Sequence, residues 1–294
     1  RSRRQRQMCI RDSYAEAITK KWKVDMLTIR EYKKVQSLEE AWELNQKRAN
    51  RVIGGMMWMR LGDSNFQTAI DLSGLGLDTI EETEDEFRIG CMVTLRQLET
   101  HPGFVSYTQN MCKESLRHIV GVQFRNLATV GGSIYGRYGF SDVLTLLIGL
   151  DSYVELYKGG IVPLREFAKG KPDNDILVQI IIKKHPVAMY YEAVRITQTD
   201  LPVLTCCGVH DKENGTYTIS IGARPSRAVI VPDEKQLLKE KLTTNAIEAY
   251  AKYAAEVVPT DSNMRGSREY RSHLVEVLSR RALEQLCEEE SKAC

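Results

Sequence analysis

Apolar residues form three groups of short runs, and each group predicts a set of strands with accompanying helices. The first group lies at residues 24–30, 52–53 and 69–72, where the runs have the length and composition of short strands. Ser37 with Glu40 three positions later is a capping-box pattern, which predicts the start of a helix between the first two runs. The chain therefore begins with a small unit of strands and one helix.

The second group predicts strands at residues 87–93, 152–157 and 175–183. The last of these runs is nearly continuous in β-branched residues, which is typical of a buried strand. A helix is predicted at residues 110–119, and residues 165–173 are expected to form a charged connector.

The third group has the pattern of strands followed by helices. It predicts strands at residues 188–195, 201–210, 216–221 and 228–231 and helices at residues 234–239, 244–256 and 267–288. An apolar stripe at helical spacing along the last helix is expected to face the core. The opposite face is expected on a solvated or partner-facing surface and carries Arg271, Arg280, Arg281 and Glu284.

A pair of glycines lies at the centre of the second group. Gly131 and Gly132 follow a short apolar lead-in, and Ser141 and Asp142 then open an apolar run that predicts a helix. Glycines let a ligand approach the main chain closely, and consecutive N–H groups in such a turn can hold phosphate oxygens. Ser141 is well placed as the N-cap of the helix. A plain turn between two elements explains the pair equally well.

A second glycine pair strengthens the ligand hypothesis. Gly54 and Gly55 follow the strand at residues 52–53 and lead into a bulky apolar segment. Two turns of this kind, each joining a strand to a bulky or helical segment, can grip the two ends of a diphosphate.

Composition excludes several classes of function. The 41 basic and 39 acidic residues leave a net charge of +2, which gives no case for binding nucleic acid or an anionic membrane. The seven cysteines show neither a C-x-x-C pair nor iron–sulfur spacing, and the five histidines show no metal-ligand spacing. No apolar stretch approaches the ~18 residues of a membrane span. Scattered cysteines suit reduced thiols, so we expect a cytoplasmic protein.

The first residues differ from the rest of the chain. RSRRQRQMCIRDS lacks the apolar core of a secretion signal. It resembles a peptide made when sequencing-adapter DNA is translated, and a basic arm is the alternative. Residues 1–22 are therefore expected to be a non-native or disordered extension.

Longer stretches resemble a known family. RNLATVGGSIYGRYGFSDVLTLLIGLDSYVEL resembles the second flavin-binding loop of the FAD (medium) subunit of molybdenum hydroxylases, the xanthine dehydrogenase and carbon monoxide dehydrogenase flavoprotein family. The family pattern RN-x-A-[TS]-[VIL]-GG-[NS], followed by SD, is met at every fixed position. VIGGMMWM stands where the family has A-G-G-T-[DE]-L, and Met56, Met57 and Trp58 depart from that pattern. YEAVRITQTDLPVLT and SREYRSHLVEVLSRRALEQ resemble the family's C-terminal domain.

The resemblance implies an α+β fold. A two-part FAD-binding domain, of the PCMH or vanillyl-alcohol-oxidase-like type, would be followed by a C-terminal α/β domain with a small antiparallel sheet and helices. The two FAD-binding subdomains would occupy residues 23–77 and 78–184. The C-terminal domain, similar to that of carbon monoxide dehydrogenase flavoproteins, would occupy residues 185–290.

The resemblance also implies the residues that hold FAD, with no catalytic side chain because the flavin carries the chemistry. Backbone groups would hold the pyrophosphate at Val52, Ile53, Gly54, Gly55, Met56, Met57 and Trp58. Further cofactor-binding positions are Ile119, Thr129, Gly131, Gly132, Ser133, Tyr135, Ser141 and Asp142. Those expected near the flavin ring are Ile176, Leu177, Tyr191 and Glu192. Glu192 stands where the family often has lysine, and Tyr191 has the alternative role of a core strand residue.

In the family, electrons pass from a molybdenum cofactor in one subunit, through two [2Fe–2S] clusters in another, to FAD and then to NAD⁺ or another acceptor. The resemblance thus implies a xanthine dehydrogenase-like oxidoreductase subunit in a heterotrimer, with an iron–sulfur subunit and a molybdopterin-binding subunit as partners. Two alternatives stay open. One is a stand-alone FAD-dependent oxidoreductase of the wider fold group, and the other is a flavin-free structural relative.

Overall fold

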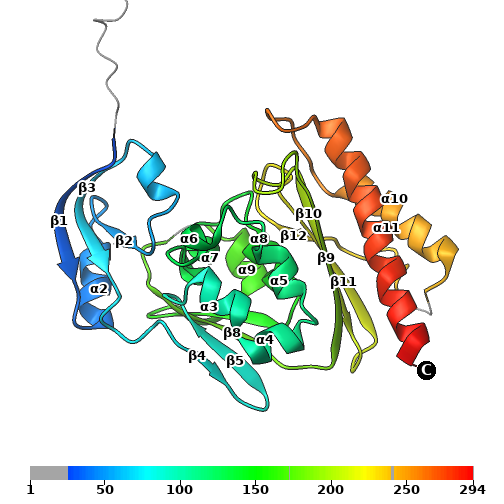
Figure 1. Cartoon of the computed structure of the whole chain (residues 1–294), viewed down its shortest axis with the longest axis horizontal. Helices are drawn as coiled ribbons and strands as arrows, with labels where there is room; N and C mark the ends of the chain where they lie inside the picture. The colour runs from blue at the N-terminus through cyan, green and yellow to red at the C-terminus, as the bar shows by residue number, and fades with distance from the viewer. Residues whose placement is uncertain (1–25, 172, 240–241, 294) are drawn as a thin grey trace, which may run out of the picture.

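The computed structural model describes residues 26–171, 173–239 and 242–293, and the expectation for residues 1–22 lies outside them. Three sheets follow one another along the chain, with helices packed around the second and third (Figure 1). The predicted α+β class, with an antiparallel sheet and helices in the C-terminal part, is confirmed. No helix within the described residues is long and apolar enough to span a membrane.

The first sheet is parallel and has the order β1-β3-β2. Its elements are β1 (Thr28–Lys34), α2 (Leu38–Asn45), β2 (Arg51–Ile53), the 3-10 helix η1 (Met59–Leu61) and β3 (Asn65–Asp71). The predicted strand includes residues 26 and 27, but β1 begins at Thr28, where its pairing with β3 starts; predicted residues 24 and 25 lie outside the described residues. Ser37 caps α2 as predicted, since its hydroxyl accepts from the Glu40 N–H at 3.1 Å.

The second sheet is antiparallel and has the order β4-β5-β8-β6-β7. Its strands are β4 (Ile80–Glu82), β5 (Glu86–Gly90), β6 (Ser152–Leu156), β7 (Gly160–Pro163) and β8 (Leu177–Lys183). Its helices are α3 (Leu95–Thr100), α4 (Pro102–Tyr107), α5 (Met111–Leu116), α6 (Val122–Arg125), α7 (Val130–Tyr135), α8 (Asp142–Ile148) and α9 (Leu164–Lys169). These helices and the sheet share one core, in which β8 is the buried strand that its β-branched run predicts.

The helix α9 corrects one prediction. The sequence predicts a charged connector at residues 165–173, but a helix occupies most of it. Three apolar residues of the helix, Leu164, Phe167 and Ala168, are buried. The charged residues between them obscure this short apolar face in the sequence.

The third sheet is antiparallel, has the order β12-β11-β10-β9 and lies between two layers of helices. Its strands are β9 (Val187–Val194), β10 (Leu204–Asp211), β11 (Thr216–Gly222) and β12 (Val229–Ile230). The helix α11 (Arg268–Ala293) covers the face on the right of Figure 1, with α10 (Thr244–Val257) packed against it, and α5 and α8 cover the other face. Successive residues of β10 therefore enter different cores, as Cys206 and Cys207 do.

The helix predicted at residues 234–239 is absent from the described structure, which has turns there. The Asp233 carboxylate accepts from the N–H groups of Leu237 and Leu238 at 2.8 and 2.9 Å. Gln236 has a φ of 57°, in the left-handed region. A side chain that captures backbone donors in this way competes with helix formation.

The position of Arg271 also corrects a prediction. It was expected on an exposed face of α11, but its relative exposure is 0%. Its guanidinium donates to the carbonyl oxygens of Val203, Asp261 and Gly266 at 2.6–2.9 Å. Helical spacing cannot show this, because the acceptors come from loops that fold over the start of the helix.

Candidate functional site

The two glycine segments lie side by side. A Cβ atom on Gly54 would lie 2.5 Å from Thr129 Oγ1, and one on Gly55 would lie 1.7 Å from the carbonyl oxygen of Leu127. Both distances are shorter than a van der Waals contact, so only glycine fits at these positions. The strand β2 thus delivers the first glycine pair directly against the start of α7.

The sequence predicts a loop turn at the second glycine pair. The structure instead places the pair at the start of the helix α7. Thr129 is the N-cap, and its hydroxyl accepts from the Gly132 N–H at 3.1 Å. Gly131 is buried, and a Cβ atom there would lie 2.5 Å from the carbonyl oxygen of Cys91. Gly132 is exposed, and its Cβ would meet only Thr129 Oγ1, at 3.0 Å. The first glycine of the pair therefore serves packing, and the second leaves the chain open to a ligand.

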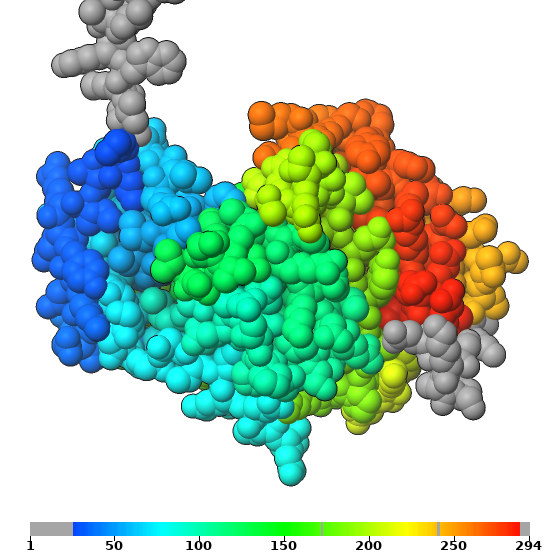
Figure 2. All heavy atoms as spheres, viewed as in Figure 1, coloured from blue at the N-terminus to red at the C-terminus, as the bar shows by residue number. Residues whose placement is uncertain are grey.

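A cleft of about 400 Å³ runs past both segments. Figure 2 shows the upper side of the molecule hollowed between the blue and cyan N-terminal part and the yellow-green loops of the third sheet. The predicted residues that line the cleft are Val52, Ile53, Gly54, Gly55, Met56, Met57, Trp58, Ile119, Thr129, Gly131, Gly132, Ser133, Tyr135, Ser141, Asp142, Ile176 and Leu177. Segments distant in the sequence therefore meet in one site.

Tyr191 and Glu192 do not line the cleft. Tyr191 is buried, and its hydroxyl donates to Asp142 Oδ1 at 2.6 Å, so it supports a cleft residue from behind. Glu192 accepts a hydrogen bond from Tyr190 at 2.9 Å and pairs with Arg281 of α11 at 2.8 Å. Neighbouring strand residues point to opposite faces of a sheet, which separates the two.

Asp142 is the most buried charged group of the cleft. It follows the N-cap Ser141, whose hydroxyl accepts from the Leu144 N–H at 3.1 Å. Burial raises the pKa of Asp142, while the charge of Arg195 and the hydroxyl of Tyr191 act against that rise. Burial and the Asp142 charge also raise the pKa of Tyr191, so the tyrosine remains a donor.

Arg195 is a cleft residue that the site prediction missed. Its Nη2 lies 2.5 Å from Asp142 Oδ1, and its Nη1 donates to the Asp200 carbonyl oxygen at 2.6 Å. The Asp200 carboxylate pairs in turn with Arg265 at 2.9 Å. The sequence does offer a signal for it, because Arg195 belongs to the stretch YEAVRITQTDLPVLT that resembles the family's C-terminal domain.

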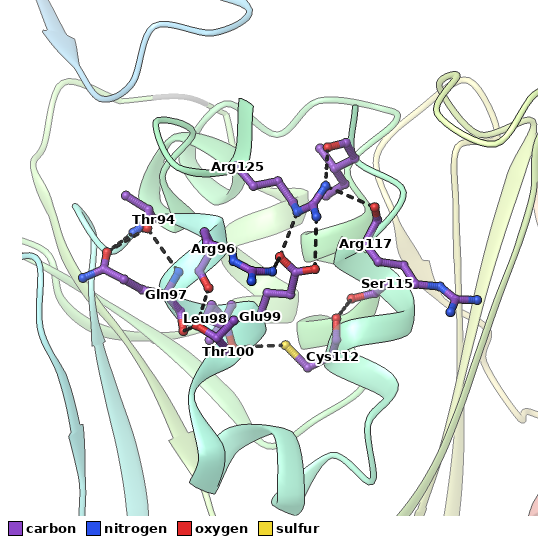
Figure 3. Close-up of polar contacts among 11 residues, drawn as sticks. Thr94, Arg96, Gln97, Leu98, Glu99, Thr100, Cys112, Ser115, Arg117 and Arg125 are labelled. Atoms are coloured by element: carbon purple, nitrogen blue, oxygen red, sulfur yellow. Dashed lines mark hydrogen bonds and ion pairs between the residues drawn. The ribbon is translucent and has the colours of Figure 1, made fainter. Parts of the chain in front are cut away.

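A buried ion pair between Arg125 and Glu99 lies behind another wall of the cleft, and Figure 3 shows its hydrogen bonds. Arg125 donates to both oxygens of Glu99, at 2.9 and 3.1 Å. It also donates to the carbonyl oxygens of Arg117 and Ile119, each at 3.1 Å. Although burial opposes ionisation, hydrogen bonds from arginines lower the pKa of Glu99. Arg125 thereby holds the loop that carries Ile119 and Val120 into the cleft.

Aromatic rings form part of the same cleft, at the segment that departs from the family pattern. The Trp58 ring lies 5.1 Å from that of Phe124 and 5.0 Å from that of Phe140, measured between centroids. Met56 adopts a φ of 57°, in the left-handed region that favours glycine. The three residues that depart from the family pattern therefore bring bulky side chains to the cleft. The first of them, Met56, has the left-handed backbone conformation.

Two findings limit the chemistry of the protein itself. Cys91 lines the cleft, but burial raises the pKa of its thiol to about 12, so it is a poor nucleophile. The described residues contain no group of histidine, cysteine and carboxylate side chains that could hold a metal ion. The groups that line the cleft suit the binding and orientation of a cofactor.

The residues present fit a flavin dinucleotide. Gly132 leaves the start of α7 open to the cleft, and Arg195 Nε is a buried donor without a partner among the described residues. The fold and this cleft define a two-part FAD-binding domain joined to a C-terminal domain. The chain belongs to the corresponding family: residues 26–184 match the FAD binding domain in molybdopterin dehydrogenase, and residues 189–286 match the CO dehydrogenase flavoprotein C-terminal domain.

Individual relatives agree with this assignment. The chain is 25% identical over 272 residues to the nicotine 6-hydroxylase medium subunit of Paenarthrobacter nicotinovorans, covering 86% of this chain and 95% of the relative. It is 23% identical over 281 residues to the xanthine dehydrogenase FAD-binding subunit of Escherichia coli O157:H7, covering 88% and 96%.

Among solved structures, a chain of the carbon monoxide dehydrogenase from Hydrogenophaga pseudoflava superposes with a TM-score of 0.79 at 23% identity, covering 87% of this chain and 96% of that chain. The chain is thus an FAD-binding subunit of the molybdenum hydroxylase family. Its cofactor is FAD.

Proposed function

We propose that this chain carries electrons within a molybdenum hydroxylase. It would take them from [2Fe–2S] clusters of a partner subunit and pass them to NAD⁺ or another acceptor. The observation that supports this role best is the cleft, where two glycine segments and a buried Asp142–Arg195 pair surround a space of about 400 Å³. That volume falls in the range of small-molecule and cofactor sites.

Within the cleft, each wall would have its own task. The segment 52–58 and the start of α7 would hold the pyrophosphate, since both line the cleft and the exposed Gly132 leaves the start of α7 open. Asp142 would lie beside polar atoms of the cofactor, and Ile176 and Leu177 would pack against its ring. Bound FAD would supply the redox chemistry, because an isoalloxazine ring accepts and releases electrons.

The partners and the location are part of the same proposal. The names of the relatives, a medium subunit and an FAD-binding subunit, describe parts of larger assemblies. We infer a heterotrimer with an iron–sulfur subunit and a molybdopterin-binding subunit, in the cytoplasm, with a xanthine dehydrogenase-like activity. The alternative of a stand-alone FAD-dependent oxidoreductase predicts no such partners.

An absorption spectrum tests the cofactor first. The purified chain, expressed together with the genes beside its own, should show oxidised-flavin bands and release FAD on denaturation. Co-purification of iron–sulfur and molybdenum subunits should accompany them. The chain is then reduced chemically without oxygen, and return of the flavin bands on adding NAD⁺ identifies that acceptor. Flavin without partners would favour the stand-alone oxidoreductase.

The same spectrum tests the alternative of a flavin-free relative, which the family assignment argues against. The observation that favours it is the bulky segment at Met56, Met57 and Trp58, whose tryptophan packs against other rings at the cleft. In that case the co-expressed protein is colourless. The variant Trp58→Leu, which has the family residue at this position, would then gain flavin.

A further inference from the structure

Two of the three nitrogen atoms of the Arg195 guanidinium have hydrogen-bond partners among the described residues. Its two terminal nitrogens contact Asp142 Oδ1 at 2.5 Å and the Asp200 carbonyl oxygen at 2.6 Å. Its Nε is shielded from solvent and has no acceptor among the described residues. The side chain is 7% exposed and lines the cleft.

A buried N–H without an acceptor is costly, because it has lost water and gained no partner. The surroundings of Arg195 also oppose simple relaxation of the side chain. Asp142 is fixed by Tyr191 at 2.6 Å, and Asp200 is fixed by Arg265 at 2.9 Å. The protein therefore holds a charged donor in place beside a cleft, as a ligand-binding group requires.

We propose that Arg195 donates its Nε–H to an acceptor atom of bound FAD, either a flavin-ring atom or a phosphate or ribityl oxygen. Asp142 and Asp200 act as positioning residues that fix the guanidinium for this contact. The inference rests on the proposed place of FAD in the cleft. The side chain comes from the C-terminal domain, so that domain would contribute directly to the cofactor site.

A purely structural role predicts different behaviour. Arg195 would then serve only to neutralise the buried Asp142 carboxylate. Lysine would fulfil that role, because it keeps a positive charge but has no Nε–H at the position of the arginine. Removing both charges together would also be harmless, because no unpaired charge would remain.

The test compares FAD affinity and flavin midpoint potential in four proteins with their partner subunits: wild type, Arg195→Lys, Asp142→Asn and the double variant Asp142→Asn with Arg195→Met. We expect FAD to bind Arg195→Lys about tenfold to a hundredfold more weakly, as loss of a charge-assisted hydrogen bond requires. The double variant should bind FAD more weakly than Asp142→Asn alone. Circular dichroism confirms that each variant is folded.

The potential distinguishes the two kinds of acceptor atom. A contact to the flavin ring changes the potential, because the charge and protonation of the ring differ between its oxidised and reduced forms, so loss of the contact shifts the potential. The shift is about 30 mV for each tenfold difference between the two forms. A contact to a phosphate or ribityl oxygen leaves the potential unchanged while the affinity falls.

Two results would overturn the inference. One is wild-type affinity and potential in Arg195→Lys, and the other is a double variant that matches Asp142→Asn. Absence of FAD from the wild-type complex would instead overturn the proposed function together with this inference. Arg281→Met is the matched control, because Arg281 pairs with Glu192, which does not line the cleft. It should leave both quantities unchanged.

Discussion

Replacing Arg125 with methionine tests how much a buried ion pair contributes beside the cleft. Arg125 and Glu99 are 4% and 5% exposed. The change removes two hydrogen bonds to the Glu99 carboxylate and two to the carbonyl oxygens of Arg117 and Ile119. Breaking a buried pair leaves a buried charge without its main partner, which costs about 3–5 kcal/mol. We expect the free energy of unfolding to fall by that amount.

A second arginine on the same carboxylate provides the control. Arg96 Nη1 lies 3.0 Å from Glu99 Oε2, but its side chain is 41% exposed. A pair with an exposed partner contributes only about 0–1 kcal/mol, so Arg96→Met should have a small effect. Combining Glu99→Gln with Arg125→Met should recover part of the loss, because no buried charge remains.

Urea denaturation at neutral pH, followed by tryptophan fluorescence, measures each free energy. Equal losses in Arg125→Met and Arg96→Met would refute the reasoning, since burial would then not determine the strength of the pair. A double variant less stable than Arg125→Met would refute the part that assigns the cost to the unpaired Glu99 charge.

Three further predictions concern the cleft and the third sheet. Gly132→Leu should abolish FAD retention with little change in stability, whereas Gly55→Ala should lower the melting temperature because its Cβ meets a carbonyl oxygen at 1.7 Å. Trp58 lines the cleft, so bound FAD should quench its fluorescence. In the variant Trp58→Phe, binding of FAD should therefore quench the total tryptophan fluorescence less than in the wild type. Equal quenching in both proteins would place the flavin away from Trp58. The protonated His185 ring donates a hydrogen bond to the Glu213 carboxylate, which raises the pKa of His185, so the stabilising effect of this bond is complete below about pH 6.5. That effect is lost as pH rises through the raised pKa, and the difference in melting temperature between wild type and His185→Gln should shrink from pH 6 to pH 9. A constant difference would contradict this.

Patterns in the sequence predicted the helices and strands that depend only on neighbouring residues. Ser37 and Ser141 cap their helices because a side-chain oxygen and backbone donors three residues away need no other part of the chain. The β-branched run of β8 forms a buried strand because β-branched residues favour strands. Bounds that depend on a distant partner were predicted less well. An example is the start of β1 at Thr28, which is set by pairing with β3.

The candidate site divides in the same way. The sequence by itself determined the two glycine segments, the helix start at Ser141 and the family whose pattern they match, because main-chain access and capping depend on residue type and spacing. Only the tertiary structure decided that Gly55 packs against Leu127, that Glu192 lies away from the cleft, and that Arg195 reaches Asp142. These contacts depend on the face of a strand from which each side chain projects and on which distant segments pack together. The spacing of residues along the sequence carries no information about the packing of distant segments.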